Sequence, residues 1–134
     1  MFLIKNGLLA QVEGHQHGDD QGIVFSGFPL HAEDYSTDVR AMMDDALIKY
    51  GAEEFRLIVL TCELHGHLGI YAILGAKMGL YAREVLNAPP DELSINSFAG
   101  LKPPVSCLND GLQVSTGATL GHGLISVQET DSPV

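Results

Sequence analysis

The sequence predicts an α+β domain in which a mixed β-sheet is flanked by helices. Segments with strand and helix patterns alternate after residue 36, the order expected when helices cover a sheet. Hydrophobic residues make up 46% of the chain and charged residues 18%, which is enough apolar material for one packed core. Because a length of 134 residues fits one domain, residues 1–134 are expected to fold as a single unit.

The N-terminal part of the chain predicts strands. Two short apolar runs, 2–4 and 8–12, flank Asn6-Gly7, a dipeptide typical of β-hairpin turns. A further apolar run at 22–28 predicts another strand.

Residues 36–50 predict an amphipathic helix, because their apolar side chains recur at helical spacing. Ser36 or Thr37 can cap its start, and Gly51 suits its C-terminal stop. The next run, 55–61, is apolar and rich in branched side chains, which is typical of a strand buried on both faces.

Residues 67–86 predict a helix that packs closely against another backbone. Glycines in this helical pattern cost up to about 1 kcal/mol each relative to alanine. The small residues recur at three- and four-residue steps: Gly69, Ala72, Gly75, Ala76, Gly79 and Ala82. Such a stripe has little side-chain bulk, so a neighbouring backbone can approach it. Lys77, Arg83 and Glu84 favour a helix in a protein core over one in a membrane.

Three short elements complete the pattern. The sequence NAPP at 87–90 ends the helix, and a strand is expected at 94–98. A helix at about 106–114 follows two prolines, and 124–128 predicts the last strand.

Charge and hydropathy exclude several classes of partner. The net charge of −10 repels phosphate, so no nucleic-acid partner is expected. No apolar run reaches the length of a membrane span, and no secretion signal is recognisable at the N-terminus. We therefore expect a cytoplasmic protein without membrane contact, in which two cysteines serve as buried thiols, metal ligands or reactive thiols.

The sequence His65-Gly66-His67 is the first candidate site. It is expected where the strand at 55–61 gives way to a helix, whose N-terminal dipole would favour neutral imidazole. Neutral imidazole is the form required of a metal ligand or a general base. The alternative is a pair of structural histidines.

Cys107 is the second candidate, at the predicted start of a short helix. The helix N-terminus stabilises a thiolate, the form that binds metals and attacks electrophiles. Asp110 and Gln113 follow at three-residue steps and can share its face. The alternative is a buried cysteine beside a capping aspartate. Cys62 is expected to be a buried thiol at the end of a strand.

Residues 63–69 (ELHGHLG) and 107–123 (CLNDGLQVSTGATLGHG) resemble two motifs of the formylmethanofuran dehydrogenase E-subunit family. Those motifs read H-G-H-x-C-P-G and C-x-x-D-x-x-Q-x-x-T-G-C-T-x-G-K-G, and both their order and their spacing agree with this chain. The resemblance covers roughly residues 60–127, the core domain without the C-terminal zinc finger of some members. It implies a thioredoxin-like core with a cleft that can bind zinc.

The resemblance implies a role for each matched residue. Metal ligands would be His65, His67 and Cys107, catalytic residues would be Cys107 and Asp110, and cofactor-binding residues would be Gln113 and His122.

Three of the departures of this chain from the family pattern concern the candidate site. Gly69 and Ala118 stand where the family has cysteines, and His122 stands where it has lysine. The loss of two thiols argues against dithiol redox chemistry.

The expected function is therefore a zinc-binding domain, similar to this E-subunit family, that works beside a formylmethanofuran dehydrogenase-type or other molybdenum or tungsten oxidoreductase. The alternative is a non-catalytic interaction or scaffold protein that has lost the metal site. Expected partners are a second copy of the chain in a homodimer, the commonest symmetric oligomer, and an oxidoreductase subunit.

Overall fold

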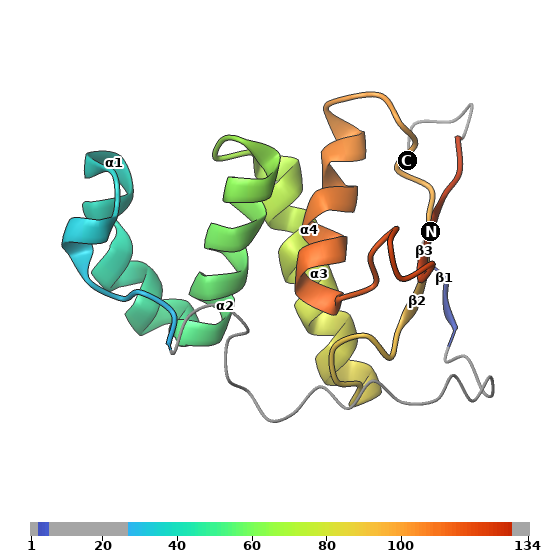
Figure 1. Cartoon of the computed structure of the whole chain (residues 1–134), viewed down its shortest axis with the longest axis horizontal. Helices are drawn as coiled ribbons and strands as arrows, with labels where there is room; N and C mark the ends of the chain where they lie inside the picture. The colour runs from blue at the N-terminus through green and yellow to red at the C-terminus, as the bar shows by residue number, and fades with distance from the viewer. Residues whose placement is uncertain (1–2, 6–26, 130–134) are drawn as a thin grey trace. The chain divides into compact units, whose positions relative to one another are not determined.

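The computed structural model describes residues 3–5 and 27–129, which are drawn in colour in Figure 1. They divide into two compact units, one formed by Met1–Leu8 with Leu57–Val134 and the other by Leu9–Arg56. The single domain expected for 1–134 stays a prediction. The predicted hairpin turn and most of the strand at 22–28 lie outside the described residues.

The second unit contains a short 3-10 turn, η1 (Ala32–Asp34), the helix α1 (Thr37–Arg40) and the beginning of α2 (Met43–His65). The predicted helix at 36–50 is thus present, with a break between α1 and α2. The predicted stop at Gly51 is also confirmed, because its φ of 81° and ψ of 169° interrupt the helical backbone there.

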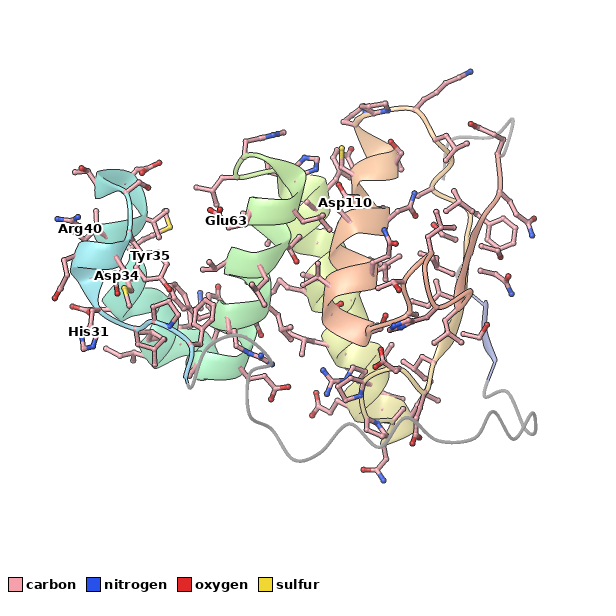
Figure 2. All side chains as sticks on the ribbon, viewed as in Figure 1. His31, Asp34, Tyr35, Arg40, Glu63 and Asp110 are labelled. Carbon is pink, nitrogen blue, oxygen red and sulfur yellow. The ribbon has the colours of Figure 1, made fainter. Side chains whose placement is uncertain are left out.

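Aromatic and backbone contacts hold the entrance to α1. The rings of Tyr35 and Phe55 pack edge to face with centroids 5.7 Å apart. The Tyr35 hydroxyl donates to the Pro29 carbonyl at 2.7 Å, and the Arg40 guanidinium donates to the Tyr35 carbonyl at 2.9 Å. Figure 2 labels Tyr35 and Arg40 among these side chains.

The strand predicted at 55–61 is wrong, because these residues belong to helix α2. A continuous apolar run does not distinguish a buried strand from a buried helix by periodicity. Thr61, a branched residue that favours strands, is accommodated because its hydroxyl donates to the Leu57 carbonyl one turn earlier, at 2.7 Å.

The first unit contains a small mixed sheet. β2 (Ser94–Ser97) lies between β1 (Leu3–Lys5) and β3 (Ile125–Val127), antiparallel to the former and parallel to the latter. The predicted mixed sheet and its strands at 94–98 and 124–128 are thereby confirmed, and the fold is α+β. A thioredoxin-like core stays a prediction.

Two helices accompany this sheet: α3 (Ile70–Leu86) and α4 (Leu108–Thr116), the latter entered through the 3-10 turn η2 (Val105–Cys107). Both were predicted. The core between the sheet and α4 consists of Ile95, Leu112, Ala118 and Ile125, with Met78 of α3 packed against it. Figure 1 shows α4 beside the strands.

The glycine stripe of α3 contacts α4 at close range, as predicted. A Cβ added at Gly75 would lie 2.9 Å from the carbonyl carbon of Leu108, closer than real Cβ contacts. In the reverse direction, a Cβ at Gly111 would lie 2.8 Å from the carbonyl carbon of Gly75. The two backbones therefore meet where each helix has a glycine.

A buried polar network fixes the start of α4 beneath the sheet. The Ser97 hydroxyl donates to the side-chain oxygen of Asn109 at 2.5 Å, and the Asn109 amide donates to the Gly100 carbonyl at 3.1 Å.

In the part of the chain that the structure describes, no helix is both long and apolar enough to cross a membrane.

Candidate functional site

His65 is the last residue of α2, where Gly66 ends the helix. Gly66 has a φ of 86°, which favours glycine, and its N–H donates to the Cys62 carbonyl at 2.8 Å. His65 therefore lies at a helix C-terminus. The predicted position at a helix N-terminus is wrong for this residue, because the strand expected before it is a helix.

Asp110 of α4 holds the His65 ring. Its Oδ2 lies 2.8 Å from His65 Nδ1, and the His65 side chain is only 10% exposed. A carboxylate only accepts hydrogen bonds, so Nδ1 carries the proton in this contact. The neutral ring then has its lone pair on Nε2. Figure 2 labels Asp110 on α4.

Gly69 lies against both histidines. A Cβ at this position would lie 2.7 Å from His65 Nε2 and 3.5 Å from His67 Nε2. The two rings are themselves neighbours, with centroids 4.3 Å apart. Both Nε2 atoms thus approach the place that a side chain at residue 69 would occupy.

Cys62 is also a neighbour of Gly69, which the sequence pattern did not indicate. It lies on α2, one turn before His65, and the Gly69 N–H donates a hydrogen bond to its sulfur. Burial raises the pKa of the Cys62 thiol, the Gly69 hydrogen bond opposes that shift, and the charge of Glu63 adds to it. The three-residue spacing from Cys62 to His65 would have placed them on one helix face, had the segment been recognised as a helix.

Cys107 is the last residue of η2 and the N-terminal cap of α4, so its predicted place at a helix start is confirmed. Its N–H donates to the Pro104 carbonyl at 3.3 Å, and its side chain is half-buried. It precedes Asp110 by one helical turn. Across residues 3–5 and 27–129, no three His, Cys, Asp or Glu side chains are gathered closely enough to hold a metal ion.

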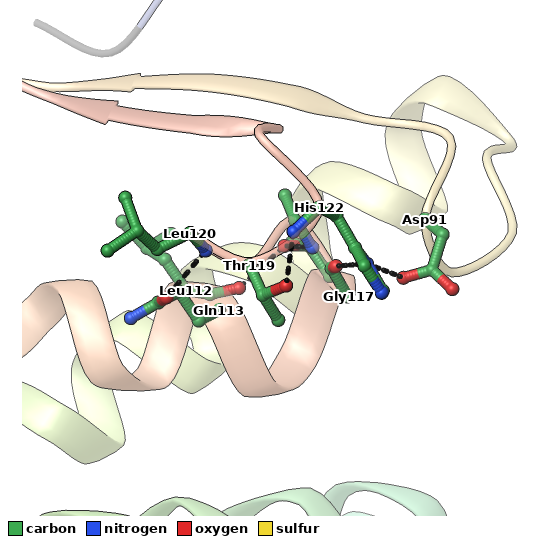
Figure 3. Close-up of polar contacts among 9 residues, drawn as sticks. Asp91, Leu112, Gln113, Gly117, Thr119, Leu120 and His122 are labelled. Carbon is green, nitrogen blue, oxygen red and sulfur yellow. Dashed lines mark hydrogen bonds and ion pairs between the residues drawn. The ribbon is translucent and has the colours of Figure 1, made fainter.

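Gln113 and His122 lie toward the other end of α4 (Figure 3). The Gln113 side-chain oxygen accepts the Leu120 N–H at 3.0 Å. His122 Nδ1 lies 3.1 Å from the Gly117 carbonyl and 3.5 Å from Asp91 Oδ1. These contacts fix the turn that follows α4.

Gln113 follows Asp110 by one turn of α4, whereas His122 lies beyond the end of that helix. Gly117, which His122 contacts, follows Asp110 by seven residues, about 10 Å along a helix. The structure therefore brings His65, His67 and Asp110 together and leaves His122 apart from them.

Comparison with known proteins identifies a family. The sequence model of a family described as "FmdE, Molybdenum formylmethanofuran dehydrogenase operon" matches residues 64–134, more than half of the chain. A "Probable S-adenosyl-L-methionine-binding protein" of Archaeoglobus fulgidus is 35% identical over 69 residues. That match covers 50% of this chain but only 19% of the relative, so the chain spans about a fifth of its length. No solved structure matches. The chain belongs to the FmdE family, associated with the molybdenum formylmethanofuran dehydrogenase operon.

Proposed function

We propose that this domain is a zinc-binding protein that works beside a formylmethanofuran dehydrogenase-type molybdenum or tungsten oxidoreductase. The family's operon supports the partner. The hydrogen bond between His65 and Asp110 is the observation that carries the proposed metal site.

A carboxylate that accepts from one nitrogen of a histidine is the usual support for metal binding by the other nitrogen. It fixes the tautomer and the orientation of the ring and makes the ligand more basic. Asp110 stands in this relation to His65, and the free Nε2 faces Gly69, which has no side chain to block it. Asp110 is thus proposed as a positioning residue.

The donor types fit zinc. His67 offers a second Nε2 beside the first, and Cys107 is proposed as a thiolate ligand from the start of α4. Imidazole and thiolate together favour zinc among the available ions. Because the described residues contain no assembled group of three donors, side chains must rotate to complete the site. When bound, zinc with three protein ligands would activate a water, whereas a fourth protein ligand would make the site structural.

An exposed apolar strip on α3 supports function within an assembly. Ile70, Leu74, Tyr81 and Val85 recur at steps of four and seven residues, so they share one helix face, and all four are exposed. Exposed apolar faces of this kind mark interaction sites. We propose a homodimer or a complex with the oxidoreductase, and light scattering of the purified chain distinguishes the dimer from the monomer.

Elemental analysis of protein purified without a histidine tag tests the metal site. We expect bound zinc after dialysis against zinc and removal of the excess. Joint replacement of His65, His67 and Cys107 by alanine should abolish this binding. The control is His122→Ala, which removes an imidazole from the turn after α4 and should leave zinc binding unchanged. Absence of zinc from the wild-type protein, or zinc that survives the triple replacement, would refute the proposal.

A further inference from the structure

We propose that the exposed apolar strip of α3 is a self-complementary interface, against which α3 of a second copy of this chain packs in the antiparallel direction. The strip consists of Ile70, Leu74, Tyr81 and Val85. This inference rests on the assembly named in the proposed function, commits it to one partner, and does not involve the metal site.

The strip is exposed and faces away from α4. Ile70 is 81% exposed, Tyr81 68% and Val85 62%. At about 100° per residue, the four side chains of the strip fall within roughly 60° of one another around the helix. The small residues that contact α4 lie on the opposite side of α3. The crossing of α3 and α4 therefore makes no use of the strip.

The spacing of the strip is the same when it is read from either end. Its members follow one another at steps of four, seven and four residues. When two α3 helices pack antiparallel about the midpoint of the strip, Ile70 lies against Val85 of the second copy. Leu74 then lies against Tyr81 of that copy. A two-fold interface requires this reciprocity, because residue i contacts j and j contacts i. The symmetric spacing thus favours a second copy as the partner.

The distribution of charge also favours contact between copies through α3. The chain has a net charge of −10, so two copies repel each other over most of their surface. Of its 17 acids and 7 bases, α3 contains one acid, Glu84, and two bases, Lys77 and Arg83. Contact through α3 brings apolar side chains together and keeps most of the carboxylates on other elements, out of the interface.

The length of the strip determines the expected strength of the dimer. It extends about 22 Å along the helix axis, and the axes of packed helices lie about 8–10 Å apart. Such a contact is smaller than the roughly 800 Å² per partner of a standard interface. We therefore expect a reversible dimer that forms as the protein concentration rises. Salt should strengthen it, because salt screens the repulsion between two acidic copies.

Analytical ultracentrifugation of the full chain, from low micromolar to submillimolar concentration, measures this association. We expect Tyr81→Glu to weaken dimerisation by at least about tenfold, because each copy then places a charge in the interface. Val85→Glu is a second variant, and thermal unfolding shows whether each variant keeps its fold. The matched control is Leu120→Glu, at a leucine that is 76% exposed but lies in the turn after α4. The control should dimerise as the wild-type protein does.

Disulfide cross-linking tests the antiparallel arrangement. Ile70→Cys and Val85→Cys are oxidised separately and as a mixture, and mass spectrometry of the linked peptides distinguishes these links from those of the native thiols. A disulfide needs Cα atoms within about 7 Å of each other. In the proposed dimer, position 70 meets position 85, whereas the two copies of position 70 lie about 22 Å apart along the helices. We expect the 70–85 link in the mixture and neither the 70–70 nor the 85–85 link.

The results distinguish this interface from the proposed metal site. A dimer that both glutamate variants leave intact, or 70–70 links in place of 70–85 links, overturns the inference and assigns the dimer to another surface. A wild-type chain that stays monomeric at every concentration also overturns it, and the strip is then covered by the oxidoreductase or by another segment of this chain. If both glutamate variants unfold, the pattern of cross-links decides. Loss of zinc binding would refute the metal site and leave this interface standing.

Discussion

Replacement of Gly75 by alanine is a direct test of the contact between α3 and α4. The added Cβ would lie 2.9 Å from the carbonyl carbon and 3.0 Å from the Cα of Leu108, and closer still to the carbonyl oxygen. Ordinary van der Waals contact of a Cβ begins at 3.4 Å. The atoms in the way belong to the backbone, so the two helices must separate, which loses dispersion contacts along the whole crossing.

Two opposing effects set the magnitude. Alanine improves helix propensity over glycine by up to about 1 kcal/mol. Overpacking at a tight contact costs about 1–3 kcal/mol. The expected net effect is a decrease in the free energy of unfolding of up to about 2 kcal/mol. For a domain of this size, each 1 kcal/mol lowers the melting temperature by roughly 4 °C. Gly75→Leu should be worse, because its larger side chain meets the same backbone.

Thermal unfolding followed by circular dichroism measures this effect. The matched control is Gly121→Ala, where the nearest atom to an added Cβ, Thr119 Oγ1, is 3.9 Å away. The control should have the same melting temperature as the wild-type protein. A Gly75→Ala variant as stable as the wild type, or more stable, would contradict the close-packing argument, and an equal loss in the control would show that the effect is not specific to the crossing.

Three further predictions concern the candidate site. Gly69→Ala should lower zinc affinity, because its methyl group would lie 2.7 Å from the His65 ring and displace it from Asp110; calorimetric titration with an unchanged Kd would contradict this. Asp110→Asn should lower zinc affinity by about 10–100-fold, because the ring loses its orienting carboxylate; full affinity in the variant would remove that role. Burial raises the pKa of the Cys62 thiol above its ordinary value of 9.0, so the unfolded chain loses this proton at lower pH than the folded one. The contribution of this thiol to the free energy of unfolding of the metal-free protein should therefore be fully present below pH 9 and be lost above it. Denaturant titrations against pH in which Cys62→Ser loses stability equally would exclude this thiol as the cause.

The elements near the site could be predicted where residues typical of helix ends and turns agreed with the spacing of small and apolar residues. For α3 and its glycine stripe, small residues at three- and four-residue steps predicted both the helix and its close contact. The segment 55–61 failed because an apolar run without alternation fits a strand and a buried helix equally well. That one error moved His65 from a helix start to a helix end and concealed the relation of Cys62 to it.

The candidate site divides in the same way. His65 and His67 could be selected from their spacing alone. The contact between His65 and Asp110 joins residues 45 positions apart, and no local pattern predicts a contact at that separation. The role of Gly69 was also hidden, because the sequence shows a missing thiol there, whereas the structure shows two imidazole nitrogens facing the residue.

The close crossing of α3 and α4 and the candidate site depend on the same two helices. Gly69 is the N-terminal cap of α3, and Asp110 adjoins Gly111, whose Cα lies against the α3 backbone near Ala72. The distance between these helices therefore determines how far the Asp110 carboxylate stands from the chain that carries Gly69. Bulkier side chains along the stripe would hold α4 farther away and would lengthen the 2.8 Å contact with His65. Because a hydrogen bond weakens steeply beyond its normal length, the small residues of α3 contribute to the position of the imidazole as well as to the packing of the core.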